Sequence, residues 1–254
     1  MASASAADVA GKVIDLKKPV GASLKPDRFY WSFDDGIIGE SEPTTVVDQS
    51  ENGFDGQIAR DRAPVAPIYV DGVFGAGIYM QGNPQVSWRP GQKQDIASAP
   101  SKLLMKGLPF TAGIWFKMDD LKTNGHVLIY RDDILIGWQL VVQRDAAEDV
   151  DADGTSWFFD LGLGDSREKS KSQAFTSVFA DRQWHHIGFS VSPDPDGENF
   201  TVVYWLDREI FDTVSFKATI PDPDPEKQFL CVGNGVWGML DDVFITTGIH
   251  TFKK

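Results

Sequence analysis

The amino-acid sequence predicts an all-β protein, a two-sheet antiparallel sandwich of the jelly-roll type. From residue 27 onward, short runs of Val, Ile, Phe, Trp and Tyr alternate with clusters of Gly, Pro, Asp and Asn, a pattern typical of strands joined by tight turns. After Pro26 no stretch has the period of a long amphipathic helix. Because so many strands in 254 residues must cover each other's apolar faces, we expect two packed sheets in one domain.

The chain is expected to comprise an N-terminal leader, residues 1–26, and a sandwich domain, residues 27–254. We interpret the leader as a short helix from Asp8 to Lys18 or as a disordered segment, because Gly11 weakens the helical pattern. Its small residues, in "MASASAADVAG", resemble the region around an export cleavage site. We therefore expect an exported protein, located in an extracellular, periplasmic or organellar lumen compartment.

The strands of the domain are expected as short segments with turn residues between them. In "HHIGFSV" a period of two places Ile187, Phe189 and Val191 on one face of a sheet and His186 and Gly188 on the other. The expected strands span residues 28–34, 56–59, 76–80, 84–88, 110–117, 126–130, 134–143, 155–161, 174–179, 184–191, 200–206, 209–216, 228–232 and 239–246.

Charge and composition exclude several classes of function. The formal net charge is −13 and no basic run with interleaved aromatic residues is present, so we expect no nucleic-acid partner. No apolar run approaches the roughly 20 residues of a membrane helix, so we expect no membrane insertion. The single cysteine, Cys231, allows no intrachain disulfide.

A series of segments follows a recognisable order between residues 29 and 247: "WSFDDG", "VVDQSENGFDG", "GVFGAGIYMQG", "PFTAGIWFKM", "QWHHIGFSV", "VVYWLDREI" and "LCVGNGVWGMLDDVFI". This order resembles the laminin-G-like branch of the concanavalin A-like lectin/glucanase superfamily. The resemblance implies two curved antiparallel sheets in which the first and last strands lie side by side. Where relatives usually have an Asp-Gly turn, this chain has Leu206-Asp207-Arg208, so we expect a different or longer turn there.

Four acidic residues form a candidate metal site. The resemblance implies a structural Ca²⁺ near the meeting point of the first and last strands, and its motif positions fall on Asp34 and Asp241, with Asp35 and Asp242 adjacent to them. A hard cation takes six to eight oxygen ligands, which carboxylates and backbone carbonyls can supply. The alternative is that Asp34 and Asp241 accept hydrogen bonds from backbone amides at strand ends.

A second, weaker candidate for calcium lies in "DVDADGTSWFFD", where Asp149, Asp151 and Asp153 have the spacing of a calcium-binding loop. The flanking segments have the pattern of strands, whereas an EF-hand needs two helices. The alternative, a solvated acidic hairpin tip, is therefore favoured.

Sugar-binding sites commonly combine flat aromatic rings with amide and charged partners for hydroxyl groups. Trp88 is the main candidate, because it ends a strand before a long polar loop and has Arg89 and Gln92 beside it. Trp138 and Trp157 complete the candidate ligand-binding set. The alternative is that Trp88 is buried at the end of its strand, as most tryptophans largely are.

Non-catalytic recognition of a carbohydrate is the function that the sequence favours, and we assign no catalytic residue. The paired carboxylates that glycoside hydrolases carry on one strand are missing, and no orienting carboxylate is recognised beside His185 and His186. The alternative is a structural or assembly subunit that makes protein–protein contacts in a larger complex. A polysaccharide-active enzyme is the third possibility, and it is disfavoured.

Overall fold

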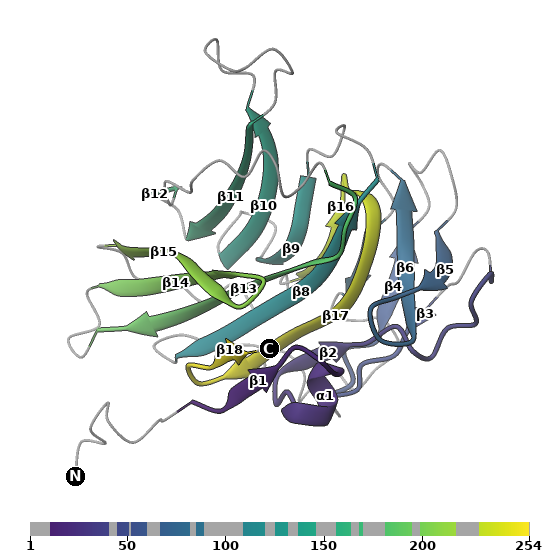
Figure 1. The fold of residues 1–254 in the computed structure, drawn as a ribbon, viewed down its shortest axis with the longest axis horizontal. Helices are drawn as coiled ribbons and strands as arrows, with labels where there is room; N and C mark the ends of the chain where they lie inside the picture. The colour runs from purple at the N-terminus through teal and green to yellow at the C-terminus, as the bar shows by residue number, and fades with distance from the viewer. Residues whose placement is uncertain are drawn as a thin grey trace.

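The protein is a β-sandwich in the computed structural model, as the sequence predicts (Figure 1). The structure describes residues 11–40, 45–50, 52–59, 67–81, 85–88, 109–119, 125–131, 137–145, 156–163, 168–169, 181–194, 199–216 and 229–253. Within these ranges the only helix is α1, Val20–Ser23, and no helix has the length and apolar character needed to cross a membrane.

Sheet I carries the strands that build the candidate site. Its strands follow the order β15–β14–β13–β8–β17–β6–β5, and β2 pairs with β17 beside this path. All of these pairings are antiparallel. The strands are β2 (Phe29–Trp31), β5 (Ile68–Asp71), β6 (Ala76–Gln81), β8 (Phe110–Met118), β13 (His185–Pro193), β14 (Phe200–Leu206), β15 (Glu209–Phe216) and β17 (Trp237–Thr247).

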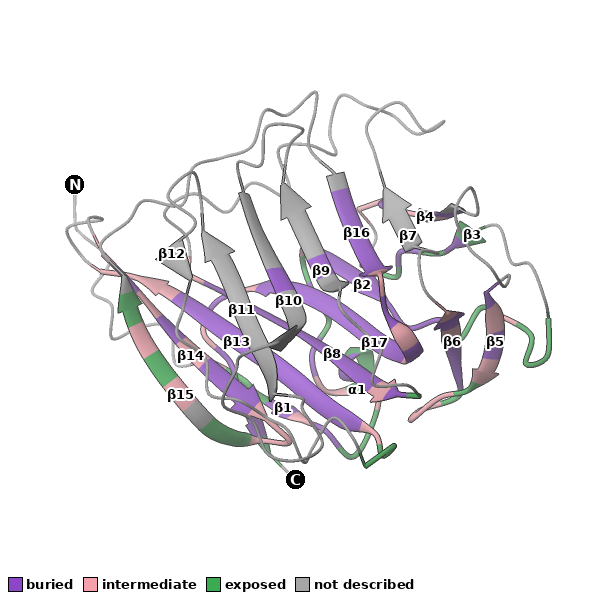
Figure 2. Cartoon of the chain, turned by 90° about the horizontal axis from the view of Figure 1, so that it is seen from above, coloured by how far each residue is buried: buried purple, intermediate pink, exposed green. Residues whose placement is uncertain are grey.

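Sheet II forms the opposite layer, in the order β12–β11–β10–β9–β16–β7–β4–β3. Figure 2 shows β16 and the coloured parts of β9 and β10 lying across β8, β13 and β17 of sheet I. The strands of sheet II are β3 (Thr45–Val46), β4 (Gly56–Ala59), β7 (Gln85–Trp88), β9 (Gly125–Arg131), β10 (Gly137–Asp145), β11 (Ser156–Leu163), β12 (Glu168–Lys169) and β16 (Phe229–Asn234).

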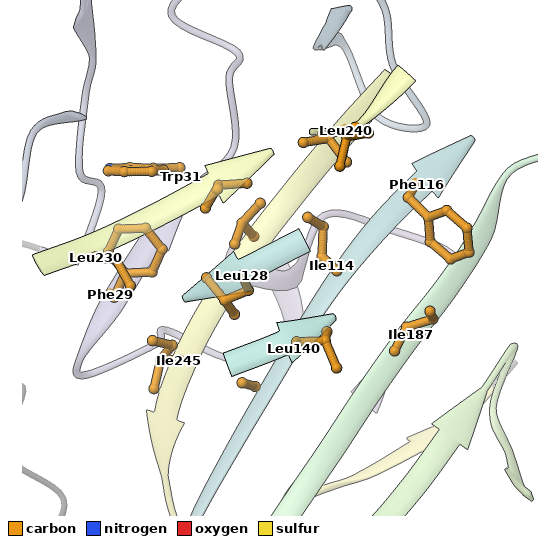
Figure 3. Packing of buried hydrophobic residues seen from close by; sticks show 14 of the residues in the cluster. Phe29, Trp31, Ile114, Phe116, Leu128, Leu140, Ile187, Leu230, Leu240 and Ile245 are labelled. Carbon is orange, nitrogen blue, oxygen red and sulfur yellow. The ribbon is translucent and has the colours of Figure 1, made fainter. Parts of the chain in front are cut away.

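The main hydrophobic core fills the space between the two sheets. Ile114 and Ile187 of sheet I belong to the same buried cluster as Leu128 and Leu140 of sheet II (Figure 3). Full burial of each such side chain contributes about 1.5–3 kcal/mol, so this interface is the principal source of stability. In β13 the predicted alternation is confirmed, since Ile187, Phe189 and Val191 all lie in this cluster.

A second hydrophobic cluster, which we call the outer cluster, covers the other face of sheet I. On β13 the residues that alternate with the core positions face it, and the ring of His186 lies 4.7 Å from that of Phe252. A Cβ atom at Gly188 would lie 2.6 Å from Phe252, so glycine makes room for this ring. The outer cluster comprises Ile14, Leu16, Val20, Leu24, Tyr30, Trp115, Trp205, Phe244 and Phe252.

Part of the expected leader is integrated into the fold. β1, Val13–Asp15, pairs in parallel with β18, Thr251–Lys253, and α1 follows it. The helix expected from Asp8 to Lys18 is therefore wrong over β1. Pairing with β18 and the burial of Ile14 and Leu16, at a spacing of two, outweigh local helical preference there. The domain boundary after residue 26 stays a prediction, although the side chains before it pack on sheet I.

The expected strands of the domain are present wherever the structure describes them, with ends that differ by a few residues. The largest difference is β10, expected over 134–143 and observed as Gly137–Asp145. The expected strand 174–179 lies outside the described residues. Strands that the sequence reading missed are β1, β3, β5, β12 and β18, none longer than four residues.

The turn between β14 and β15 differs from the Asp-Gly pattern but is short. It consists of Asp207 and Arg208, with φ angles of 47° and 86°. Positive φ at both central residues is characteristic of the tight two-residue hairpin turn whose twist matches that of the strands. The turn therefore differs from Asp-Gly in its residues, as expected, but it is not longer than a two-residue turn.

Candidate functional site

The first expected strand of the domain meets the last one, as the resemblance implies. β2 pairs with β17, with Tyr30 opposite Phe244. Against β8, one extra residue is inserted in β17 between Asp241 and Phe244, which is a β-bulge. Asp242 lies in this bulge with a φ of 51°. Because the bulge breaks the strand alternation, both Asp241 and Asp242 are buried, at 0% and 1% exposure.

Asp241 is directed at the turn between β5 and β6. Its Oδ2 accepts hydrogen bonds from the backbone N–H groups of Val73, at 2.7 Å, and Phe74, at 3.1 Å. Its Oδ1 is buried and has no hydrogen-bond partner among the residues that the structure describes. Burial, followed by the nearby carboxylate of Asp242, raises the pKa of Asp241 to about 8. A charged Asp241 is therefore unfavourable unless a proton or a cation neutralises it.

Asp34 approaches the same turn from β2. Its Oδ1 accepts a hydrogen bond of 3.0 Å from the backbone N–H of Ala76, and partial burial raises its pKa. A Cβ atom at Gly75 would lie 2.1 Å from this oxygen, and one at Gly72 would lie 2.5 Å from Oδ2 of Asp241. The two glycines thus allow both carboxylates to contact one turn. The hydrogen bonding to backbone amides that the sequence left as an alternative is present.

Asp242 connects β17 to α1 and β2. Its Oδ1 accepts a hydrogen bond of 2.5 Å from the hydroxyl of Tyr30, and its Oδ2 accepts one of 2.9 Å from the backbone N–H of Val20. Burial raises the pKa of Asp242 to about 6, although both hydrogen bonds oppose this change. Burial, and then the Asp242 carboxylate, raises the pKa of Tyr30. We call Asp34, Asp241, Asp242 and Tyr30 the acidic corner.

Asp35, the fourth predicted metal ligand, binds a different segment. Its Oδ2 accepts a hydrogen bond of 3.2 Å from the backbone N–H of Val47, and partial burial raises its pKa. The charge of Asp34 raises the pKa of Asp35 as well as those of Asp241 and Asp242. Asp34 is thus coupled electrostatically to the other three predicted acids, and Asp241 to Asp242, whereas the hydrogen bond of Asp35 goes to the Val47 segment.

The acidic corner fits a cation only in part. In the described segments, no three Asp, Glu, His or Cys side chains are arranged as a metal-binding group. The unpartnered Oδ1 of Asp241 is nevertheless the kind of oxygen that Ca²⁺ requires, and three acids with raised pKa values share the corner. The side chains supply part of a calcium ligand set, and backbone carbonyls or water must supply the remainder.

A pocket of about 370 Å³ opens beside the acidic corner. We call it the α1 pocket, because α1 and the segments flanking it form one wall while β2 and the residues after it form the other. Tyr30 and Asp34 belong both to the corner and to the pocket. Its lining includes Pro19, Ala22, Lys25, Tyr30, Asp34 and Gln49. The sequence reading missed this pocket, because the leader that forms one wall has no strong pattern.

The predicted ligand-binding tryptophans lie in sheet II. Trp88 ends β7 and is paired in register with Leu230 of β16, a buried residue of the main core. Trp138 and Trp157 belong to β10 and β11. The side chains of these three residues lie outside the described part of the structure, as do Arg89 and Gln92 and the second acidic set, Asp149, Asp151 and Asp153.

His185 and His186 have different surroundings. The ring of His185 contacts carboxylates through both nitrogens: Nδ1 lies 2.6 Å from Asp207 and Nε2 lies 3.0 Å from Asp181. The ring of His186 is fully buried against the outer cluster, neither of its nitrogens has a hydrogen-bond partner among the described residues, and burial lowers its pKa to about 3. The expectation that no carboxylate orients this pair is wrong for His185. Asp181, which lies four residues before His185 in the sequence, could have indicated this contact.

Comparison with known proteins identifies the fold. No family model matches the chain, and no curated protein matches it. Domain 4 of AbnA, a GH43 extracellular arabinanase from Geobacillus stearothermophilus, in complex with arabinotriose, is similar over 87% of this chain and 92% of that domain, at 16% identity and a TM-score of 0.53. Trypanosoma rangeli sialidase is similar over 86% of this chain and 30% of the sialidase, at 13% identity and a TM-score of 0.50. At such identities the similarity shows a shared β-sandwich, jelly-roll fold.

Proposed function

We propose that the protein is a non-catalytic carbohydrate-binding module of the laminin-G-like branch of the concanavalin A-like superfamily. The observation that carries this proposal is the match to domain 4 of an arabinanase, a structure described as a complex with arabinotriose, over nearly the full length of both chains. The match covers a whole domain, so the comparison concerns the complete sandwich. Fold alone does not determine function, so the proposal also needs a site able to bind a sugar.

The α1 pocket gives the sandwich such a site. Its volume of about 370 Å³ lies at the lower end of the roughly 300–1,000 Å³ that small-ligand sites occupy. Its lining combines carboxylate, amide and ammonium groups with proline and tyrosine rings. Polar groups of this kind bind hydroxyls, and apolar surfaces contact the C–H faces of a sugar. The candidate set in sheet II, centred on Trp88, stays a competing prediction for the place of binding.

A structural Ca²⁺ at the acidic corner is part of the proposal. Three acids with raised pKa values lie together, and one buried carboxylate oxygen of Asp241 has no hydrogen-bond partner in the described part of the chain. A divalent cation would neutralise these charges and join β2, β17 and the turn between β5 and β6. Extracellular modules typically bind calcium with dissociation constants of about 10⁻⁴–10⁻³ M, so we expect an affinity in that range if the protein is exported.

Affinity electrophoresis of the intact chain through gels containing neutral polysaccharides, arabinan among them, tests carbohydrate binding. We expect at least one polysaccharide to retard migration and the corresponding oligosaccharide to relieve the retardation competitively. Bovine serum albumin in the same gels controls for sieving. A chain that migrates identically in every gel would contradict the proposed function.

The alternative function is that of an assembly subunit, and one observation favours it. Ile37, Ile38 and Val47 are large apolar side chains that are 72%, 52% and 45% exposed, and Asp35 connects their two segments through its bond to Val47. Apolar side chains exposed together are typical of protein–protein contacts. Purification from the source in a fixed ratio with other proteins, combined with indifference to sugars, would favour this alternative.

A further inference from the structure

We infer that the α1 pocket is the saccharide subsite of this protein and that its ligand is a neutral oligosaccharide. The inference rests on the proposed carbohydrate binding and assigns it to a pocket that the sequence did not predict. Gln49 and Lys25 serve as hydrogen-bond donors to the ligand, and Asp34 serves as an acceptor for its hydroxyl groups. Pro19 and Ala22 provide the apolar contact.

The side chains of the pocket suit the chemistry of a sugar ring. Lys25, Asp34 and Gln49 are exposed residues of the lining, whereas Tyr30 is buried at 4% exposure. A sugar hydroxyl both donates and accepts, so a carboxylate acceptor beside amide and ammonium donors can satisfy neighbouring hydroxyl groups. Pockets in which a few polar groups converge over an apolar lining are typical of small-ligand sites.

Hydrogen bonds hold the β2 side of the pocket in place before any ligand arrives. The backbone N–H of Gln49 donates to the carbonyl of Tyr30 at 2.8 Å, and its side-chain Nε2 donates to Oγ of Ser32 at 2.6 Å. The Tyr30 hydroxyl is bound to Asp242. A side chain fixed in this way loses little conformational freedom on binding, which favours affinity.

Contacts with the acidic corner fix the α1 side of the pocket. The backbone N–H of Val20, the first residue of α1, donates to Asp242 at 2.9 Å. A Cβ atom at Gly21 would lie 2.7 Å from the Tyr30 ring, so α1 lies directly against that ring. The bulge in β17 therefore positions the pocket walls as well as the acids.

The charge around the pocket selects a neutral ligand. Asp34 lines the pocket, and the chain carries a net charge of −13. A carboxylated or sulfated sugar would meet this negative potential, which disfavours its binding, whereas neutral hydroxyl groups do not incur that cost.

Isothermal titration calorimetry with arabinotriose, and with whichever neutral oligosaccharide competes in the gels, tests the assignment. We expect Gln49→Ala and Lys25→Ala each to weaken binding about tenfold, the loss of one or two hydrogen bonds. Ala22→Trp, which places a ring in the pocket from an exposed position of α1, is expected to abolish binding. Lys17→Ala and Gln183→Ala, exposed residues of the same types outside the lining, are the matched controls and should bind as the unaltered chain does.

The outcomes separate this inference from the proposed function. Failure of the unaltered chain to bind any neutral sugar would overturn the proposed function, and the subsite with it. Binding that persists in Gln49→Ala, Lys25→Ala and Ala22→Trp, and is lost in Trp88→Ala, would leave the function standing and move the site to sheet II. Unchanged melting temperatures of the variants establish that lost binding reflects the pocket and not misfolding.

Discussion

At the scale of single residues, His185 forms a charge-dependent link between two segments. It contacts Asp181, just before β13, and Asp207, in the turn after β14. Burial alone would lower the pKa of His185, but the hydrogen bonds to Asp207 and Asp181 outweigh it and the pKa is raised. Burial alone would raise the pKa of Asp207, but the hydrogen bond with His185 outweighs it and the pKa is lowered. The pair therefore stabilises the fold while His185 is protonated and Asp207 is ionised.

The sign of the pH dependence follows from these directions. A raised His185 pKa gives stability that is complete below its unfolded value of about 6.5 and is lost as pH rises through the folded value. A lowered Asp207 pKa gives stability that is complete above about 3.9 and is lost as pH falls through the folded value. We expect His185→Gln to lower the melting temperature most between about pH 4 and 6.5 and least near pH 9.

The magnitude of this effect is expected to be small, because Asp181 and Asp207 are 41% and 42% exposed and solvent screens the pair. We expect less than about 1 kcal/mol. Thermal unfolding of both chains across this pH range measures it, with Gln183→Ala as a control that should show no pH-dependent difference. A loss of equal size at pH 5 and pH 9 would rule out the charged pair.

Asp241 is the residue on which the calcium proposal depends. We expect chelation by EDTA to lower the melting temperature of the unaltered chain by about 5 °C or more where calcium had been near 100 times its dissociation constant. Asp241→Asn removes a charged ligand, so its melting temperature should no longer respond to EDTA. Asp35→Asn is the matched control and should keep the response, because Asp35 binds Val47 instead of the corner. Equal melting temperatures with and without EDTA in the unaltered chain would exclude a structural calcium.

At the scale of elements, the β1–β18 pair closes the outer cluster over sheet I. Ile14 of β1 is fully buried and lies opposite Phe252 of β18. Val13, its neighbour on the same strand, is 45% exposed. The terminal strands thus act as a cover for aromatic side chains that sheet I presents on its outer face.

Replacing Ile14 by alanine tests this cover. We expect Ile14→Ala to lower the free energy of unfolding by about 2–4 kcal/mol, the usual cost of truncating a buried isoleucine. Val13→Ala should change it by less than about 0.5 kcal/mol. Urea denaturation provides both values, and similar small losses in the two variants would contradict a buried, stabilising β1.

The difference between predicted and missed elements has a physical cause. Long strands such as β8 and β13 have enough residues for a strand pattern to be recognised in the local sequence alone. β1 has three residues, and its strand character depends on pairing with β18 from the far end of the chain. Sequence periodicity over so few residues cannot distinguish such a strand from a helix or a coil.

At the scale of the whole molecule, the two ends of the chain meet and build the candidate site. The motif resemblance predicted that Asp34 and Asp241 would approach each other, and both bind the turn between β5 and β6. The bulge that buries Asp242 and attaches it to α1 could not be predicted, since it depends on the register between β17 and β8. The α1 pocket could not be predicted either, because folding brings together the separate segments that line it.

The central claim, a sandwich that recognises a carbohydrate at this junction, is tested most directly by titrating the intact chain with neutral oligosaccharides in a calorimeter. We expect a dissociation constant in the micromolar range, about −8 kcal/mol at 1 μM, with one site per chain. An absence of heat with every sugar, from a chain that is folded and co-purifies in a fixed ratio with other proteins, would contradict it.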